Sequence, residues 1–265
     1  MLHEAHATPP ATTASGEEDA DLAALLARTA GNRLQELRRR SGDLSPAELK
    51  TSGDAEGQRA LAEGLAAARP SDAVLSEEAT DDHGRLAATR VWIIDPLDGT
   101  REFSEGRADW AVHVALWQDG ELTAGAVALP GLDLVLTSAP PPVVPPRDET
   151  SPLRMAVSRS RPPAIATQVA EAMGAELVAM GSAGFKVAAV IRGEADLYVH
   201  GGGQYEWDSA APVAVARAAG LHASRLDGSP LRYNQPDPFL PDLVVCRPEL
   251  AEQLLTVLSG LGAGR

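Results

Sequence analysis

Apolar residues recur at helical spacing near the start of the chain and then give way to short strand-like runs. Over residues 18–40 the leucines and alanines share one helical face, with acidic residues first and basic residues last, which predicts a helix that covers the core. Residues 41–53 are polar and interrupted by two glycines and a proline, so we expect the second helix over residues 54–68. Residues 1–17 have no apolar period and are predicted to form a mobile tail.

Strand signals follow in two groups, separated by a proline-rich connection at residues 139–152. The first group comprises a short strand at residues 73–75, a buried strand at 91–94 and an antiparallel meander at 110–117, 122–129 and 132–136. In the second group, strands at 155–158, 176–180, 195–200 and 242–246 alternate with helices at 162–173, 183–192, 209–219 and 249–258. We therefore expect an α/β protein of layered helices and sheets. Its N-terminal half (18–140) would hold a mixed or antiparallel sheet, and its C-terminal half (154–265) would be α/β.

Composition limits the classes of function. With 265 residues, of which 44% are hydrophobic, the chain can supply one large or two smaller packed cores. A formal net charge of −14 disfavours nucleic acid or an anionic membrane as a partner, and an anionic substrate would need local cations. The single cysteine, Cys246, leaves no internal disulfide. No apolar run approaches the ~20 residues of a membrane span, and no signal-peptide pattern is seen, so we expect a cytoplasmic protein.

The densest chemistry lies in V-W-I-I-D-P-L-D-G-T-R-E-F at residues 91–103, where a buried strand runs into acidic and turn-forming residues. Asp95 is expected at the carboxyl end of the strand, where Pro96 turns the chain. In such a turn the carbonyl of Leu97 points the same way as the carboxylates of Asp95 and Asp98. Oxygen donors suited to a cation therefore converge within one turn.

The same turn suits a phosphate, because Gly99 lets the backbone approach a ligand and Thr100 can cap a following helix. Asp, Pro and Gly are also ordinary turn residues, so the motif alone leaves both interpretations open. Two further acidic segments favour chemistry: S-E-E at 76–78 follows a short strand, and E-W-D at 206–208 opens a helical segment. Asp208 taken alone would equally serve as an N-cap.

A cluster of these carboxylates would need cations. Each pair of carboxylates at 4 Å repels by ~4 kcal/mol at an effective dielectric of 20. Oxygen ligands without His or Cys select hard ions, so Mg²⁺ is favoured over Zn²⁺, with Mn²⁺ as a substitute. His113, His200 and His222 show no metal-ligand spacing and receive no role.

The order and spacing of these motifs are similar to those of the inositol-monophosphatase superfamily of Mg²⁺-dependent, lithium-sensitive phosphatases. The resemblance is carried by W-I-I-D-P-L-D-G-T, by S-E-E before it and by E-W-D-S-A-A after it. D-G-T-R-E-F resembles the D-G-T-K-E-F of 3'(2'),5'-bisphosphate nucleotidases of the CysQ type, whereas inositol monophosphatases more often carry D-G-T-x-N-F. S-R-S at 158–160 and G-S-A-G-F-K at 181–186 also favour that branch. The resemblance implies the sugar-phosphatase fold of alternating helix and sheet layers, and an isologous homodimer.

The resemblance also implies two or three Mg²⁺ ions per site and inhibition by Li⁺. The first ion would be held by Glu77, Asp95 and the Leu97 carbonyl, and the second by Asp95, Asp98 and Asp208. A third, weaker ion would lie near Glu77 through water.

The catalytic residues implied are Asp54, Thr100 and Glu77. Thr100 and Asp54 would orient a water that attacks phosphorus in line, without a covalent intermediate. Asp54 belongs to T-S-G-D at 51–54, a partial match to the family's T-x-A-D that lacks the usual S-P-V-T before it. An N-cap role for Asp54 is the alternative.

The N–H groups of Gly99 and Thr100 would hold the phosphate. The remaining substrate contacts implied by the resemblance are Arg101, Ser158, Arg159, Ser182, Lys186, Tyr205 and Asp208. For the cations among them, a solvated surface position is the alternative. Three functions remain open: a nucleotidase acting on adenosine 3',5'-bisphosphate and its sulfated form in sulfate assimilation, a phosphatase of inositol monophosphate or fructose 1,6-bisphosphate, and a non-catalytic phosphate-binding protein.

Overall fold

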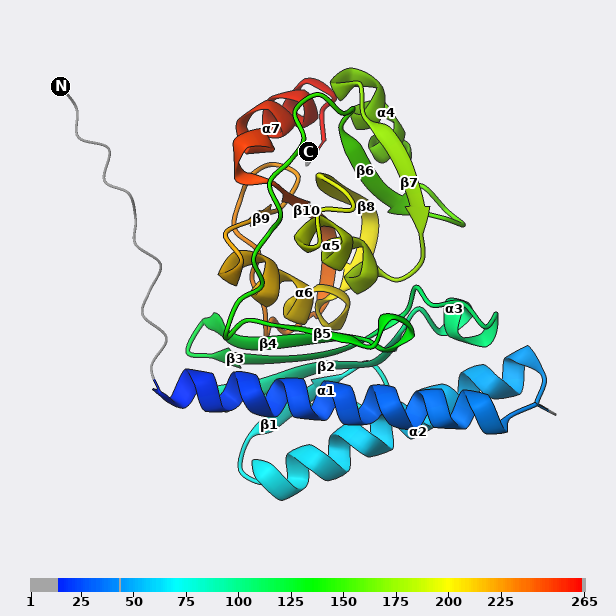
Figure 1. Cartoon of the computed structure of the whole chain (residues 1–265). Helices are drawn as coiled ribbons and strands as arrows, with labels where there is room; N and C mark the ends of the chain where they lie inside the picture. The colour runs from blue at the N-terminus through cyan, green and yellow to red at the C-terminus, as the bar shows by residue number, and fades with distance from the viewer. Residues whose placement is uncertain (1–13, 43, 264–265) are drawn as a thin grey trace.

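The computed structural model describes residues 14–42 and 44–263. The predicted tail therefore falls outside the described residues, except for residues 14–17, which belong to the first helix instead. In Figure 1 the chain forms alternating layers of helix and sheet, as predicted. From bottom to top these layers are a helix pair, a sheet, a second helix pair, a second sheet and a third helix pair.

The first sheet and its outer helices come from the N-terminal part of the chain. The helices are α1 (Ala14–Arg40) and α2 (Pro46–Ala68). The strands, in spatial order, are β1 (Ala73–Ser76), β2 (Arg90–Asp98), β3 (Ala111–Gln118), β4 (Glu121–Leu129) and β5 (Leu134–Thr137). β1 is parallel to β2 and the other pairs are antiparallel, which confirms the predicted meander.

The second sheet follows the proline-rich connection. Its strands, in spatial order, are β7 (Glu176–Met180), β6 (Arg154–Ser158), β8 (Leu197–Tyr205), β10 (Phe239–Cys246) and β9 (His222–Ser224). The helices between the sheets are α5 (Ala183–Ile191) and α6 (Glu206–Ala218), and the outer ones are α4 (Ala164–Met173) and α7 (Ala251–Gly260). Short helical segments complete the fold: η1 (Gly84–Ala87), α3 (Thr100–Ser104), η2 (Pro130–Leu132) and η3 (Pro248–Leu250). The three-residue strand β9 was not predicted. The division into two halves remains a prediction.

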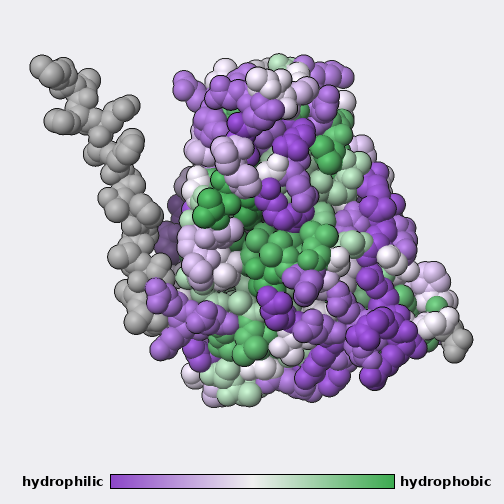
Figure 2. All heavy atoms as spheres, in the orientation of Figure 1, coloured by the Kyte–Doolittle hydropathy of each residue, from purple (hydrophilic) through white to green (hydrophobic). Residues whose placement is uncertain are grey.

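Alternation along the strands explains the layers. In β2, Val91 and Ile93 belong to the core shared with α5 and α6, whereas Trp92 and Ile94 belong to the core shared with α1 and α2. Because successive side chains point to opposite faces, a continuous apolar run buries both faces of the sheet. Figure 2 shows polar side chains over much of the outer surface and an apolar area between the two sheets.

Several predicted boundaries were wrong, among them the end of β8, which continues to Tyr205, and the start of β10 at Phe239. Helix α2 begins at Pro46 and not at residue 54, because Ser45 and Glu48 form a capping box within the segment predicted as loop. Helix α6 begins at Glu206, so Asp208 lies inside its first turn. Strand β2 continues through Pro96 to Asp98, because its pairing with β3 shifts register between Asp95 and Asp98, which accommodates a residue without an N–H.

Among the described residues, no helix combines the length and apolar character needed to cross a membrane.

Candidate active site

A cleft of about 640 Å³ opens at the carboxyl end of β2. It is lined by the turn after β2, the end of β6, the start of α5 and the junction of β8 with α6. Of the residues predicted to contact substrate, Arg159 is not among those that line the cleft, and the others do line it: Gly99, Thr100, Arg101, Ser158, Ser182, Lys186, Tyr205 and Asp208. Glu77 and Asp98 line it as well. Residues from distant parts of the sequence thus meet at one cleft.

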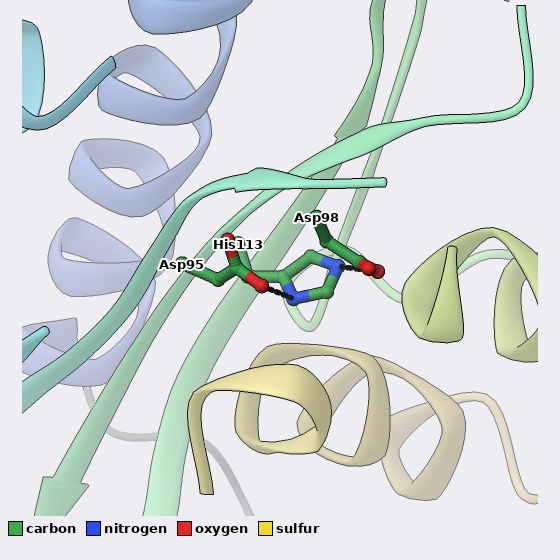
Figure 3. Close-up of side chains that lie close together, drawn as sticks. All are labelled: Asp95, Asp98 and His113. Carbon is green, nitrogen blue, oxygen red and sulfur yellow. Dashed lines mark ion pairs between the residues drawn. The ribbon is translucent and has the colours of Figure 1, made fainter. Parts of the chain in front are cut away.

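His113 lies between two of the predicted metal ligands and was missed by the sequence reading (Figure 3). Its buried ring places Nδ1 3.9 Å from Asp95 Oδ2 and Nε2 3.3 Å from Asp98 Oδ2. Nδ1 also lies 3.1 Å from the Trp207 carbonyl, which can only accept, so Nδ1 is the donor. Asp95, Asp98 and His113 each offer one ligand atom. These three atoms lie within 4.8 Å of one another, which is close enough to hold a metal ion. The pairing of β2 with β3 could have indicated His113, because His113 lies directly opposite Asp95 in that register.

The start of α5 holds the carboxylate of Asp98. Its Oδ2 accepts hydrogen bonds from Ser182 Oγ (2.5 Å) and the Gly184 N–H (2.7 Å), and its Oδ1 accepts one from the Ala183 N–H (3.2 Å). These contacts connect an acid from the first sheet to a helix that lies between the sheets. They also explain G-S-A-G at 181–184, because small residues let the backbone N–H groups reach the carboxylate.

The other acids are close together and incompletely paired. Asp95 Oδ1 accepts the Leu97 N–H at 3.0 Å, but its buried Oδ2 has no hydrogen-bond partner among the described residues. Burial, and then the charge of Glu77, holds the pKa of Asp95 well above its usual range. Partial burial of the carboxyl group and repulsion from Asp208 raise the pKa of Glu77 to about 7. Burial and repulsion from Asp98 likewise raise the pKa of Asp208 to about 7.

This environment fits a divalent cation. A cation would relieve the repulsion that raises these pKa values and would give the orphaned Asp95 oxygen a partner. Carboxylate oxygens favour Mg²⁺ or Mn²⁺. The nitrogen of His113 stands beside these oxygens, a neighbour that the sequence pattern did not indicate.

Asp54, from α2, contacts Thr100 at the turn after β2. Thr100 Oγ1 lies 3.4 Å from Asp54 Oδ1 and 3.2 Å from the Leu97 carbonyl oxygen. Asp54 lies inside α2, so its alternative as an N-cap is wrong. Burial, and then the charge of Glu78, raises the pKa of Asp54 to about 6.

Two glycines of α2 make this meeting possible. A Cβ atom on Gly53 would lie 2.8 Å from Cδ2 of Leu97, and one on Gly57 would lie 2.7 Å from the carbonyl oxygen of Pro96. Helix α2 therefore packs its backbone directly on the turn after β2. Asp54, between the two glycines, is brought to Thr100 by this close approach.

Lys186 is a buried cation of the cleft, so the surface alternative is wrong for it. Its Nζ donates to the carbonyls of Gly181 and Ser182, and burial lowers its pKa while Asp98 opposes that shift. Arg101, by contrast, is exposed at the cleft. Arg159 is engaged by Glu102 at 2.9 Å and by Glu105 at 2.7 Å. The cleft residues that the sequence did not indicate include Arg161, Tyr198, His200, Gly201 to Gly203 and Gln204.

Comparison with known proteins identifies the family of this chain. The sequence profile of the inositol monophosphatase family matches residues 14–261. The chain is 54% identical over 257 residues to the 3'-phosphoadenosine 5'-phosphate phosphatase of Mycobacterium leprae, covering 91% of this chain and 93% of that protein. It is 32% identical to the 3'(2'),5'-bisphosphate nucleotidase CysQ of Escherichia coli K12, covering 72% and 81%.

Solved structures show the same fold. CysQ from Bacteroides thetaiotaomicron, a bacterial member of the inositol monophosphatase family, superposes with a TM-score of 0.77 at 26% identity and covers 87% of this chain and 97% of that one. Inositol monophosphatase TM1415 of Thermotoga maritima has a TM-score of 0.73 at 20% identity, covering 92% and 98%. With a profile match over nearly all of its described length, this chain belongs to the inositol monophosphatase family.

Proposed function

We propose that the protein is a phosphomonoesterase that removes the 3'-phosphate of adenosine 3',5'-bisphosphate, and of its sulfated form 3'-phosphoadenylyl sulfate, in sulfate assimilation. The observation that carries the proposal is the 54% identity, over most of both chains, to a protein named 3'-phosphoadenosine 5'-phosphate phosphatase. The cleft supports it, because the acids, a buried lysine and exposed arginines line one space. Cytoplasmic location and a homodimer complete the proposal.

The proposed cofactor is Mg²⁺, two or three ions per site, with Mn²⁺ as a substitute and Li⁺ as an inhibitor. Glu77, Asp95, Asp98, Asp208 and the Leu97 carbonyl would hold the ions, and the orphaned oxygen of Asp95 supports this assignment. When bound, such ions acidify water and offset the negative charge of the phosphoryl group. The carboxylates would in turn give up their retained protons.

The protein's own residues would orient the reactants. The Thr100 hydroxyl can donate to Asp54 or to the Leu97 carbonyl while accepting a hydrogen bond from the attacking water. Asp54, with a pKa raised to about 6, is suited to hold a proton from that water near neutral pH. The N–H groups of Gly99 and Thr100 would hold the phosphate, and Gly99 has a φ of 91°, which suits glycine.

The rest of the substrate would meet the polar wall of the cleft. Lys186 offers a buried positive charge, and Arg101 offers an exposed one. Ser158 and Ser182 add hydroxyl groups on the same wall. A second phosphate requires cations of this kind, because the protein as a whole carries a charge of −14.

The proposal is tested by phosphate release from adenosine 3',5'-bisphosphate, inositol 1-phosphate and fructose 1,6-bisphosphate, with Mg²⁺ and with or without Li⁺. We expect kcat/KM to favour the nucleotide by roughly a hundredfold, about 2.7 kcal/mol of transition-state binding. Asp98→Asn serves as the matched control, because turnover by a contaminating phosphatase would survive it. Equal rates on the sugar phosphates would contradict the nucleotide assignment, and no turnover of any of them would contradict the reaction.

A further inference from the structure

Two exposed aromatic side chains lie against each other beside the cleft. Aromatic residues make up only 4% of the chain, and most are buried in its cores. Tyr205 and Phe239 are 46% and 48% exposed. Among the large exposed hydrophobic side chains of the described residues, these two are the aromatic ones. Exposing aromatic surface forgoes the free energy of burying it, so two such residues in contact indicate a binding surface.

The Tyr205 ring is held in a fixed orientation. It stacks on Trp207 with ring centroids 4.8 Å apart and an interplanar angle of 10°. Phe239 meets the same ring edge-on at 6.0 Å and 82°. The strand register explains the second contact, because Tyr205 and Phe239 are directly paired between β8 and β10. Trp207 thus covers one face of the ring and Phe239 stands nearly perpendicular to it, while 46% of Tyr205 remains exposed.

A strip without side chains lies next to this ring. Gly201, Gly202 and Gly203 line the cleft on β8, just before Tyr205. Gly202 and Gly203 have φ angles of 111° and 90°, which side chains other than glycine rarely adopt. No atom lies within 4 Å of the position of a Cβ on Gly202, so the space beside it is open. A Cβ on Gly203, by contrast, would meet the Phe239 ring at 2.5 Å, so a flat group could lie over Gly202 beside the tyrosine.

The tyrosine is connected to the acidic site by one turn of backbone. Its N–H donates to Asp208 Oδ2 at 2.6 Å, at the start of the helix that carries Asp208. The position of the ring relative to the acids is therefore set by the main chain. A substrate whose phosphate reaches Asp208 would place a neighbouring flat group near Tyr205.

We propose that Tyr205 is a specificity-determining residue that stacks on the base of a nucleotide substrate, with Trp207 and Phe239 holding its ring. The inference rests on the proposed function, because a sugar phosphate has no base to stack. Every base offers a π-face to an aromatic ring, whereas inositol and fructose offer only hydroxyl-bearing saturated rings. Tyr205 would thus separate nucleotides from sugar phosphates at a shared metal site.

The test compares Tyr205→Ala, Tyr205→Phe and Phe239→Ala with the unaltered protein. For Tyr205→Ala we expect kcat/KM on adenosine 3',5'-bisphosphate, relative to inositol 1-phosphate, to fall by about 10- to 100-fold, chiefly through KM. Tyr205→Phe retains the ring and should stay within about threefold, and Phe239→Ala should give a smaller loss than Tyr205→Ala. Calorimetric affinity for adenosine 5'-monophosphate should fall in the same order. Leu177→Ala, at an exposed apolar residue of β7, is the matched control.

The Tyr205→Ala variant retains the backbone N–H that binds Asp208, so a loss cannot come from that hydrogen bond. An equal loss on both substrates, or unchanged affinity for adenosine 5'-monophosphate, would overturn the stacking role. If the unaltered protein preferred sugar phosphates while Tyr205→Ala still weakened binding of the monophosphate, the proposed function alone would fall. If it preferred sugar phosphates and the affinity were unchanged, both would fall.

Discussion

Nε2 of His113 lies only 1.9 Å from the position that a Cβ atom on Gly184 would occupy. The imidazole of β3 therefore packs against bare backbone at the start of α5. The Gly184 N–H then reaches Asp98 at 2.7 Å, while the other ring nitrogen donates to the Trp207 carbonyl at 3.1 Å. One buried ring thus sets how closely α5 and the start of α6 approach the acids of β2.

This packing gives a prediction about stability and turnover. Gly184→Ala should destabilise the protein by about 1–3 kcal/mol, because the added methyl overlaps the imidazole. In the double variant with His113→Ala the methyl has room, so the stability loss should be smaller than the sum of the single losses. Phosphate release should be low in the double variant even where stability is recovered, because the imidazole that links Asp98 to the Trp207 carbonyl is missing. Urea unfolding and kinetics measure the two effects separately.

Additive stability losses would show that the ring and the glycine do not share this space. Full turnover in the double variant would show that His113 has no effect on the position of Asp98. Gly42→Ala provides the control, because a Cβ there meets no atom within 4 Å.

The close packing of α2 on the turn after β2 gives a second prediction. Gly57→Ala favours the helix intrinsically by about 1 kcal/mol, yet its methyl would meet the Pro96 carbonyl at 2.7 Å. We expect the helix to shift, separating Asp54 from Thr100 and lowering kcat by about 10- to 100-fold. Gly64→Ala, on the same helix, meets only the end of the Leu26 side chain and should keep kcat. Equal kcat values for the two variants would contradict this account of Asp54.

The raised pKa values of the acids give a third prediction. The folded protein retains protons on Glu77 and Asp208 up to about pH 7, whereas the unfolded chain releases them near the ordinary carboxylate values. The metal-free protein should therefore lose stability as pH rises from about 4 to about 7. Mg²⁺ replaces those protons, so the increase in Tm that it causes should be larger at about pH 8 than at about pH 5.5.

Differential scanning fluorimetry in EDTA and in Mg²⁺ measures both trends. Asp98→Asn, which weakens the site, should reduce the Mg²⁺ effect at both pH values. A Tm increase that does not change with pH would show that these carboxyl groups are already ionised without the metal.

The sequence predicted what depends on local pattern and missed what depends on long-range contacts. The V-W-I-I-D-P-L-D-G-T run predicted both a buried strand and its acidic end, because alternation and turn chemistry are local. His113 was missed because its partners are Asp95 and Asp98 on the neighbouring strand and Trp207 at the start of α6. The start of α2 was missed because Pro46 and Gly53 were interpreted as breaks. Pro46 is in fact the first helical residue, and Gly53 is a contact point with the turn after β2.

A buried arginine connects the loop after β1 to the start of α6. Arg85 is 2% exposed and donates to Asp81 Oδ2 at 2.8 Å, to Asn234 Oδ1 at 2.7 Å and to the Gln235 carbonyl at 2.9 Å. The N–H groups of Asn234 and Gln235 donate in turn to the buried carboxylate of Glu206, at 2.6 and 2.8 Å. Glu206 is two residues before Asp208, so this network fixes the helix start that carries a predicted ligand.

Arg85→Ala should therefore destabilise the protein by about 3 kcal/mol, since it leaves the Asn234 side chain without its donor. Arg85→Lys should recover little, because an ammonium cannot reproduce the fork of contacts to three partners. Calorimetry should also show weaker Mg²⁺ binding, because Asp208 loses a fixed helix start. Arg59→Ala, whose partners Glu56 and Glu63 lie on the exposed face of α2, should change stability by less than about 0.5 kcal/mol. If Arg85→Ala were destabilised but kept its Mg²⁺ affinity, the network would have only a structural role. A role in positioning Asp208 requires that stability and Mg²⁺ affinity fall together.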